Sequence, residues 1–593
     1  MRISAVWAVL LLCPSALWAQ PKEGLPDNSL ITADVKAPSK ESLSFARLAG
    51  DYWEALMRLS PLDATFNNYP RYGDRLDDNS AAGRRAKALE YNSMLKRLDS
   101  IDASKLAANE RLSAEVMRWQ LSASLEAEKH KNYQWLVDHM DGPQALIANI
   151  VEQAQPMRSS VDAEALLRRM QGLPLYFRNE IEGLREGAKE KRVSARVPVE
   201  KAITQIEDIL KTPADQSPYA SAAKKLPDGI RERYTPLIMA SVEQNAYGAE
   251  REYLKFLKEE YLPKTRREKI GLGDLPGGKA DYRFAIKQQT TVDKTPEELH
   301  KIGLEELAGI HREMKAIAAK MGRSEDVTSF LAAVRKDKNN YFKTREELLR
   351  ASEAFIGRAR EKLPRYFGIL PKADVVVKPV EDFREKNSGA AEYYPAPDDL
   401  SRPGIYYVNT YRPETRATFD VASTAAHEAL PGHHLQITIA TEQRGLPTFQ
   451  RHTDFTAYVE GWALYCERLA DEMGLYTTDM DRLGMLSNQA LRASRLVVDT
   501  GIHAMSWSRQ QAIDFMLQNT PLSKEEIATE VDRYTVWPGQ ALAYKVGQRE
   551  ITALRREQEK RLGAAFDIKA FHDAVLKNGP LPLPVLRRTF QQR

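Results

Sequence analysis

The chain has 593 residues, of which 43% are hydrophobic and 28% are charged, and its formal net charge is +4. These proportions are ordinary for a soluble globular protein. The net charge is small for this length, and no run of basic residues is long enough to suggest nucleic acid, so we expect no nucleic-acid partner. The length allows either more than one domain or one large helical catalytic unit.

The N-terminus predicts export. Arg2 precedes an apolar run that ends in small residues, which is typical of a secretory signal, and we expect residues 1–19 to form a signal peptide. The run is too short for a usual membrane span, and no later apolar stretch matches it, so we expect no stable membrane insertion after signal removal. A lipid anchor at Cys13 is less favoured, because Leu12 stands where a small residue is usual. We therefore expect a periplasmic or extracellular protein, with disorder in the polar segment 20–40.

Helical patterns dominate the next part of the chain. Apolar residues recur there at three- and four-residue steps, as at Phe45 and Leu48. The segment 262–278 is rich in Pro and Gly and is the best candidate for a domain boundary or an active-site loop. We expect an N-terminal helical region over residues 41–262 and a catalytic region over residues 263–593.

The second region contains clear helix starts and three short strands. Capping boxes, in which a hydroxyl and a Glu satisfy free N–H groups at a helix start, are predicted at Thr295–Glu298, Thr344–Glu347 and Ser523–Glu526. Runs of β-branched or aromatic residues bounded by Pro, Gly or Asp predict strands within 374–382, 389–397 and 403–411. The sheet either offers an edge to which a peptide adds as a further strand or only supports the segment that follows, and the sequence favours neither.

That following segment, HEALPGHHLQ at residues 427–436, contains three of the ten histidines. A His-Glu pair followed by a second His is the pattern of zinc metallopeptidases, in which the Glu takes a proton from the metal-bound water. Position i+4 from His427 is Pro431, which cannot ligate a metal and should kink or bulge the helix. On an undisturbed helix His434 returns to the face of His427, whereas a bulge makes His433 the natural partner.

A third ligand is available on the helix expected over residues 454–474. Glu460 has apolar neighbours such as Trp462, and a buried carboxylate needs a partner, for which a metal would serve. The alternative is a solvated surface acid. Cys466, on the same helix, is the only cysteine left after signal removal, so no intrachain disulfide is expected. We interpret Cys466 as a small buried hydrophobe rather than a nucleophile.

A polar stripe follows on the helix expected over residues 491–508. Arg495, Asp499 and His503 recur at four-residue steps and so share one face. We interpret them as a network that orients metal ligands or grips the substrate, with His503 as a catalytic candidate. The alternative for each is an ordinary hydrogen bond within the core.

Four sequences carry a resemblance to a known family: HEALPGHHLQ, YVEGWALYCERL (458–469), RLVVDTGIH (495–503) and PGQALAYKVGQREI (538–551). They resemble the bacterial proteins of the domain of unknown function 885 family, which is grouped with the gluzincin metallopeptidases. The order of the motifs is similar to that of the thimet-oligopeptidase and peptidyl-dipeptidase families, in which HEFGHALH precedes a VE on a later helix. Matching these motifs implies His433 as the second metal ligand and Glu460 as the third.

The resemblance also implies a role for a late tyrosine, whose hydroxyl would hydrogen-bond the tetrahedral oxyanion. Tyr544 matches that position best, and Tyr534 lies in the same part of the sequence. A tyrosine packed in the core is the alternative. His434, Arg495, Asp499 and Tyr534 are then expected to contact the substrate or the metal ligands.

The sequence thus predicts a mainly α fold, a large helical metallopeptidase-like body with a small β-sheet next to the metal site. We expect one Zn²⁺ per chain, held by His427, His433 and Glu460, because two imidazoles, one carboxylate and an open position form the usual catalytic zinc set. Glu428 would be the general base, and the resemblance implies short peptides as substrates. The alternatives are a zinc hydrolase of a non-peptide amide and a non-catalytic binding protein braced by a metal.

Overall fold

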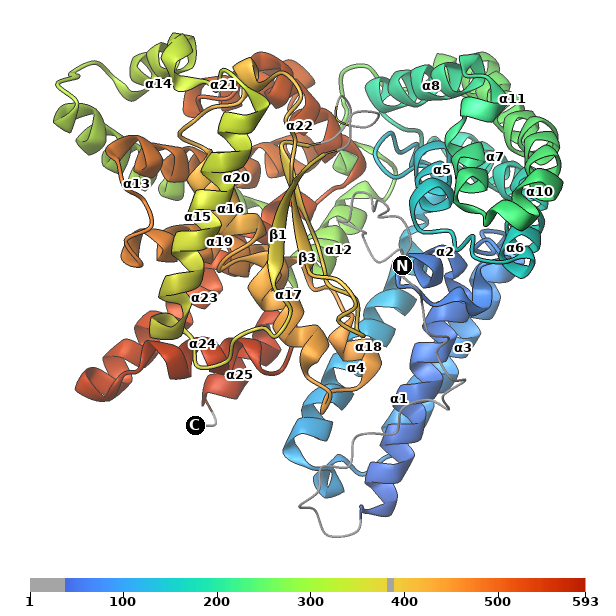
Figure 1. Ribbon diagram of the computed structural model, residues 1–593, viewed down its shortest axis with the longest axis horizontal. Helices are drawn as coiled ribbons and strands as arrows, with labels where there is room; N and C mark the ends of the chain where they lie inside the picture. Colours follow the sequence, from blue (N-terminus) through green and yellow to red (C-terminus); the bar gives the residue numbers. More distant parts are fainter. Residues whose placement is uncertain (1–37, 381–384, 386–388, 592–593) are drawn as a thin grey trace. The chain divides into compact units, whose positions relative to one another are not determined.

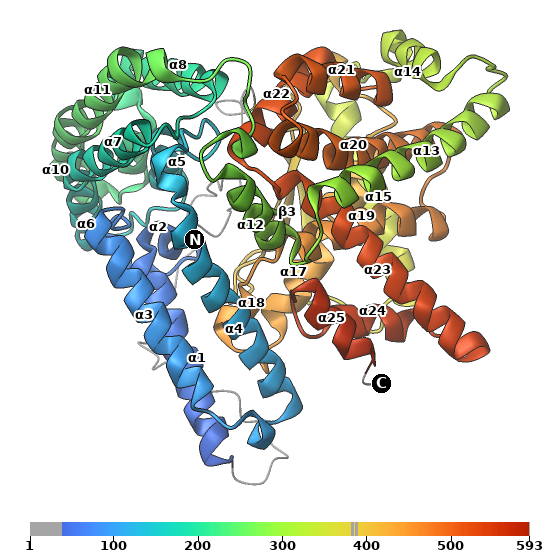
Figure 2. The same ribbon diagram turned by 180° about the vertical axis from the view of Figure 1, so that it is seen from behind.

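The computed structural model describes residues 38–380, 385 and 389–591. It is built mainly of α-helices with one small three-stranded sheet, so the predicted fold class is confirmed (Figures 1 and 2). The predicted signal peptide, residues 1–19, and nearly all of the segment 20–40 lie outside the described residues.

The chain forms two compact units, Met1–Gly278 and Lys279–Arg593. The segment 263–278, with which the expected catalytic region begins, packs with the first unit. There the backbone N–H of Arg266 donates a hydrogen bond to the carbonyl of Ser194 over 3.2 Å.

The first unit contains helices and no β-strand in the part that the structure describes. Its helices are α1 (Lys40–Leu59), α2 (Pro61–Phe66), α3 (Ala81–Asp99), α4 (Ala108–Ala127), α5 (Pro143–Gln153), α6 (Ser160–Gln171), α7 (Leu173–Lys189), α8 (Arg196–Lys211), α9 (Pro218–Ser221), α10 (Asp228–Ser241) and α11 (Tyr247–Phe256). The long helices α1, α3 and α4 pack beside one another (blue in Figure 1). Phe45 and Leu48 of α1 are buried, as the spacing of apolar residues predicts.

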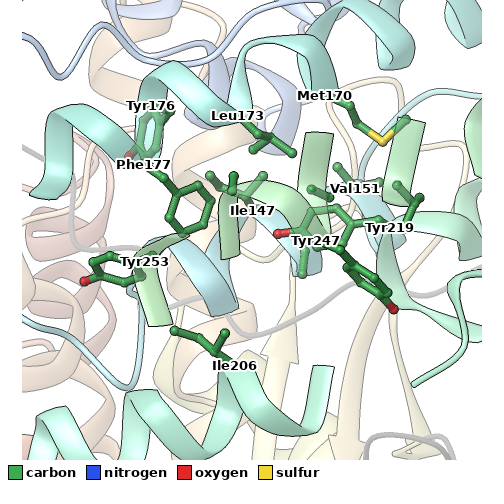
Figure 3. Close-up of a cluster of buried hydrophobic side chains, with 14 of the residues drawn as sticks. Ile147, Val151, Met170, Leu173, Tyr176, Phe177, Ile206, Tyr219, Tyr247 and Tyr253 are labelled. Carbon is green, nitrogen blue, oxygen red and sulfur yellow. The ribbon is translucent and has the colours of Figure 1, made fainter. Parts of the chain in front are cut away.

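The core of the first unit is formed mainly by apolar side chains from α5–α11 (Figure 3). Phe177 of α7 lies against Tyr253 of α11, with ring centroids 5.4 Å apart. One carboxyl group, that of Glu250, is fully buried next to this core, where the hydroxyl of Tyr219 donates a hydrogen bond to its Oε1 over 2.9 Å. Its Oε2 has no hydrogen-bond partner among the described residues, and burial raises the pKa of Glu250 to about 8.

The second unit holds the sheet and the remaining helices. These helices are α12 (Gly278–Thr290), α13 (Pro296–Lys320), α14 (Val327–Lys336), α15 (Arg345–Tyr366), α16 (Val421–Glu428), α17 (His433–Glu442), α18 (Thr448–Arg451), α19 (Thr456–Glu472), α20 (Asp479–Ala504), α21 (Arg509–Asn519), α22 (Lys524–Val536), α23 (Gln540–Leu562), α24 (Ile568–Leu576) and α25 (Leu583–Gln591). All three predicted capping boxes are confirmed, at the starts of α13, α15 and α22. Each hydroxyl accepts a backbone N–H three residues later, while the Glu reaches back to the N-cap N–H.

Helix α20 differs from the prediction at both ends. It begins twelve residues earlier than the expected Leu491, because Thr478 and Asp481 form a further capping box at its start. It ends at Ala504 rather than Ser508, since Ser506 adopts a left-handed conformation with φ of 54° that no helix continues through. The expected polar stripe nevertheless lies within one continuous helix.

The three predicted strands are confirmed as β1 (Val375–Pro379), β2 (Ala391–Tyr394) and β3 (Gly404–Val408). The strand order is β1-β3-β2, with β3 parallel to β1 and antiparallel to β2. The central strand β3 is buried along its whole length, which explains its continuous apolar and aromatic sequence. β2 packs against α16 and α17, and β1 packs against α15, so the sheet adjoins the helices that carry the histidine motif.

Helices α19 and α23 approach each other most closely at two glycines. A Cβ atom built on Gly461 of α19 would lie 2.4 Å from the Cα of Gly547, and one built on Gly547 of α23 would lie 1.7 Å from the carbonyl oxygen of Ala457. Backbone therefore rests directly on backbone, and no larger residue fits at this crossing. The contact fixes the distance between Glu460 on α19 and Tyr544 on α23.

Candidate metal centre

The histidine motif is divided between two helices. α16 ends at Glu428, the Leu430–Pro431 peptide bond is cis, and α17 begins at His433. A Cβ atom on Gly432 would lie 1.8 Å from the carbonyl oxygen of His427, so only glycine permits this close turn. The interruption that Pro431 predicts is thus a complete break between helices.

This break brings three candidate ligands together. His427, His433 and Glu460 are buried, and one donor atom from each lies within 4.8 Å of the other two. Glu460 Oε2 lies 3.3 Å from His427 Nε2 and 3.5 Å from His433 Nε2. The two imidazole rings are nearly perpendicular, with centroids 4.8 Å apart.

The geometry fits a bound metal ion. Nitrogen and oxygen ligands at about 2.0–2.1 Å from a tetrahedral ion lie about 3.3–3.4 Å from each other, which agrees with the two measured separations. Glu460 Oε2 is buried, yet it accepts no hydrogen bond of good geometry from a described residue. A buried carboxylate oxygen needs such a partner, and a cation between the three donors would supply it.

A second carboxylate orients His427. Glu467 is fully buried on α19, and its Oε1 lies 2.9 Å from His427 Nδ1. A hydrogen bond from Nδ1–H to this carboxylate leaves the Nε2 lone pair facing Glu460 and His433, as in carboxylate–histidine–metal arrangements. Burial lowers the pKa of His427, but the carboxylates of Glu460 and Glu467 outweigh it and raise this pKa to about 9.

The network behind Glu467 continues away from the cluster. Gln489 Nε2 of α20 donates to Glu467 Oε2 over 3.2 Å, and its own Oε1 accepts a hydrogen bond of 2.7 Å from Lys545 Nζ. Lys545 is 1% exposed, and its burial lowers its pKa to about 7. Hydrogen bonds thus connect α19, α20 and α23 behind the candidate ligands.

Glu428 stands beside the cluster and is half-buried. Burial raises the pKa of its carboxyl group, while the charges of His433, His427 and Arg492 oppose that effect. No described residue forms a hydrogen bond with this carboxyl group, so it can exchange a proton without breaking a structural contact. It directly follows the candidate ligand His427 in sequence.

Comparison with known proteins identifies the family. The family model described as "Bacterial protein of unknown function (DUF885)" matches residues 61–590. The chain belongs to this DUF885 family. The resemblance inferred from the four sequence motifs is therefore confirmed at the level of the family, and the relation to metallopeptidases stays a prediction.

Two solved structures have the same fold. A crystal structure described as "the putative lipoprotein from Colwellia psychrerythraea" is 28% identical, with a TM-score of 0.86, over 93% of this chain and 99% of that one. A structure of "a putative lipoprotein of unknown function from Shewanella oneidensis" is 20% identical, with a TM-score of 0.71, over 92% of this chain and 99% of that one. No curated protein matches the chain. Among the described residues, no helix is both long and apolar enough to span a bilayer.

The second histidine of the HH pair in this DUF885 protein faces elsewhere. His434 is 1% exposed, and its Nδ1 lies 2.9 Å from the hydroxyl of Tyr393 on β2 and 3.3 Å from that of Thr438. Burial lowers its pKa to about 4, so the ring is neutral at physiological pH. His433 therefore lies in the cluster, whereas His434 contacts the sheet.

The late tyrosine lies beside the candidate ligands. The ring of Tyr544 stacks along that of His427, with centroids 6.4 Å apart and planes at 19°, and it is 6% exposed. The guanidinium of Arg495 lies over this ring, 4.5 Å from its centroid. Arg495 also donates hydrogen bonds to Glu530 and, over 3.2 Å, to the hydroxyl of Tyr534. Arg495, Tyr534 and Tyr544 thus form one group with the cluster.

The remaining members of the polar stripe have other partners. Asp499 accepts hydrogen bonds from the hydroxyl of Tyr282 at 2.6 Å and from the backbone N–H of Gly539. His503 Nε2 lies 3.0 Å from the carbonyl oxygen of Tyr534. None of these contacts includes a candidate metal ligand, and the catalytic role expected for His503 stays a prediction.

Two residues near the cluster were given no role from the sequence. Glu467 lies seven residues after Glu460, two turns along the same face of α19, and this spacing was the available signal. Arg492 lies three residues before Arg495 on α20, and its guanidinium is 5.8 Å from the centroid of the Tyr544 ring. A basic residue beside a buried stripe is common on any helix, so no pattern singled out Arg492.

Proposed function

We propose that this DUF885 protein is an exported, zinc-dependent peptidase. The convergence of His427, His433 and Glu460, with Glu467 behind His427, carries the proposal. Two imidazoles and one carboxylate are the usual ligand set of catalytic zinc, whereas magnesium and calcium favour all-oxygen sites. The location of His434 away from the cluster also supports catalysis, because a purely structural zinc site usually has four protein ligands.

The residues around the cluster suit peptide hydrolysis. Zinc bound there would supply Lewis acidity, which polarises a carbonyl group and makes a water molecule easier to deprotonate. Glu428 would accept the proton of the attacking water and deliver it to the leaving amine. Tyr544 would place its hydroxyl where negative charge develops on the carbonyl oxygen. Glu467 would hold His427 in the tautomer that leaves Nε2 free to act as a ligand.

The sheet suggests how a peptide would be held. β2 is an edge strand in the order β1-β3-β2, and it packs against both α16 and α17. An extended peptide could pair its backbone with such an edge, which would place it along the helices that carry the ligands. Support of the metal helices is the other role for this sheet, and β3, buried throughout, fulfils it in either case.

Two observations support export of the protein. Residues 1–19 have the features of a secretory signal, and the solved structures with this fold are described as putative lipoproteins. Cys13 lies in that segment, outside the described residues. Mass spectrometry of the protein recovered from cells distinguishes a chain beginning at residue 20 from a lipid-modified chain beginning at Cys13.

Metal analysis and one substitution test the proposal. Protein that has never met a chelator should contain about one zinc per chain, and it should cleave peptides in a mixed library read by mass spectrometry. Glu428→Gln should keep the zinc but lose about 10²–10⁴ in rate, because the amide cannot accept the proton. Glu442→Gln, on the neighbouring helix α17, is the matched control. Absence of zinc, or turnover by Glu428→Gln equal to that of the parent, would contradict the proposal.

A further inference from the structure

Arginine side chains gather around the ring of Tyr544, beside the candidate metal ligands. The ring of Tyr544 has His427 stacked along it at 6.4 Å, while the guanidinium groups of Arg495 and Arg492 lie 4.5 and 5.8 Å from its centroid. Both arginines come from α20, one turn apart. A third guanidinium, that of Arg533 on α22, lies 3.5 Å from Glu530.

The carboxylate of Glu530 pairs with two of these arginines, Arg495 and Arg533. Glu530 Oε2 accepts hydrogen bonds from Arg495 Nη2 at 2.7 Å and from the hydroxyl of Tyr534 at 2.7 Å. Arg492 donates to the neutral Asn488 Oδ1 at 2.8 Å, and no carboxylate of a described residue forms a hydrogen bond or ion pair with it. Glu428 and Asp420 act on Arg492 only through the electrostatic field, without a hydrogen bond, and Arg495 is 4% exposed.

Each arginine also has one buried nitrogen whose N–H lacks a hydrogen-bond acceptor. Arg492 Nε, Arg495 Nη1 and Arg533 Nε are buried and make no hydrogen bond to any described residue. Buried charged donors without acceptors are costly, so an ordered water or a ligand has to complete them. Stacking on the Tyr544 ring accounts for the position of Arg495, but a ring face satisfies no N–H in the guanidinium plane.

We infer that Arg492 and Arg495 form a subsite for a carboxylate of the substrate, next to the proposed metal centre. This inference rests on the proposed peptidase function and adds a substrate class to it. Guanidinium groups match carboxylates in shape and charge. Arg492 is half-buried and so gives the ligand access to the group.

Two kinds of substrate carboxylate fit this position: the free C-terminus of a short peptide and the side chain of an acidic residue. A C-terminal carboxylate held here would make the protein release short fragments from peptide ends. An acidic side chain held here would instead make it selective for sequence. The ligand chemistry is the same in both cases, so the experiment has an arm for each.

The test measures binding without turnover. The full chain carrying Glu428→Gln and loaded with zinc is titrated by calorimetry with N-acetyl-tetraalanine, with its C-terminal amide, and with amidated N-acetyl-trialanyl-glutamate. The free acid should bind at least about tenfold more tightly than the amide, since a charged hydrogen bond is lost with the carboxylate. Tight binding of the glutamate peptide would show that a side-chain carboxylate is accepted as well.

Substitutions then assign the preference to the arginines. Adding Arg492→Gln should reduce the difference between acid and amide to less than about twofold, whereas Arg482→Gln should preserve it. Arg482 is the matched control, because it lies on the same helix and pairs with Asp471 and Asp479 instead. Equal affinity for acid and amide, no binding of either at millimolar concentration, or a preference that survives Arg492→Gln would overturn the inference. Zinc content and peptide cleavage by the parent chain report separately on the proposed function.

Discussion

The buried carboxyl group of Glu250 predicts that the first unit loses stability as the pH rises. Burial raises its pKa from the ordinary value of 4.5 to about 8, against the smaller opposing effect of the hydrogen bond from Tyr219. Between these two values the folded state holds a proton that the unfolded state has released. Rising pH therefore favours unfolding. The stability that the protonated carboxyl group contributes is fully present only below pH 4.5, and it is lost as the pH rises to about 8.

The size of the effect follows from the shift. One proton per molecule corresponds to about 1.4 kcal/mol in the free energy of unfolding per pH unit. As the pH rises from 5 to 7.5, the carboxyl group of Glu250 should therefore lower the free energy of unfolding by about 3 kcal/mol. Glu250→Gln removes the titration while keeping the shape of the protonated side chain, and its amide N–H lacks a partner equally at both pH values. The quantity to compare is therefore the pH dependence of the free energy of unfolding in the parent and in Glu250→Gln.

The assay is urea unfolding of the full chain at the two pH values, followed by hydrogen exchange of peptides from α11. The parent should lose about 3 kcal/mol more than Glu250→Gln as the pH rises from 5 to 7.5. Glu252→Gln is the matched control, since Glu252 is exposed on the same helix and should behave like the parent. Parallel curves for the parent and Glu250→Gln would refute the reasoning, because the carboxyl would then be ionised at both pH values.

The remaining predictions concern the metal centre and are measured by zinc titration against a chromophoric chelator. His433→Ala should weaken zinc binding by about 100-fold or more, whereas His434→Ala should leave it intact and cost about 1–3 kcal/mol of stability through the lost contact with the sheet; the opposite ranking would reject the assignment. Glu467→Gln should weaken zinc binding by about 10–100-fold, because the orienting carboxylate is lost; parental affinity would show that Glu467 does not act through His427. Gly432→Ala should cost about 2 kcal/mol or more in urea unfolding and weaken zinc binding, since backbone atoms must move apart; a variant as stable as the parent would contradict the steric argument.

Local signals predicted the elements of the second unit well. The hydroxyl and Glu of each capping box act within one helical turn, so three helix starts could be located from a few residues each. The strands were also predicted from short runs of neighbouring residues. Pro431 indicated the end of α16, because a proline lacks the backbone N–H that a helix interior requires. The extent of that break was not predictable, since it depends on how closely Gly432 approaches the carbonyl of His427.

Long-range contacts were beyond such reasoning. Spacing alone left His433 and His434 as alternatives, and the choice follows from Tyr393, 41 residues away, which holds His434 against the sheet. Asp499 shares a face with Arg495, yet its partner Tyr282 lies 217 residues away in sequence. Periodicity assigns side chains to a face of a helix, but the neighbours that pack on that face come from the tertiary fold.

The contact between Gly461 and Gly547 has a mechanical consequence for the site. Helices that meet through side chains can slide as rotamers change, whereas helices that meet backbone to backbone have no such play. Glu460 precedes one glycine and Tyr544 lies one turn from the other, so the candidate ligand and the proposed oxyanion donor are held by the same rigid helix contact. Substitutions in the surrounding core should therefore leave the spacing between these two groups unchanged. Under the proposed function, adaptation to different substrates would then fall to the half-buried residues at the margin of the site.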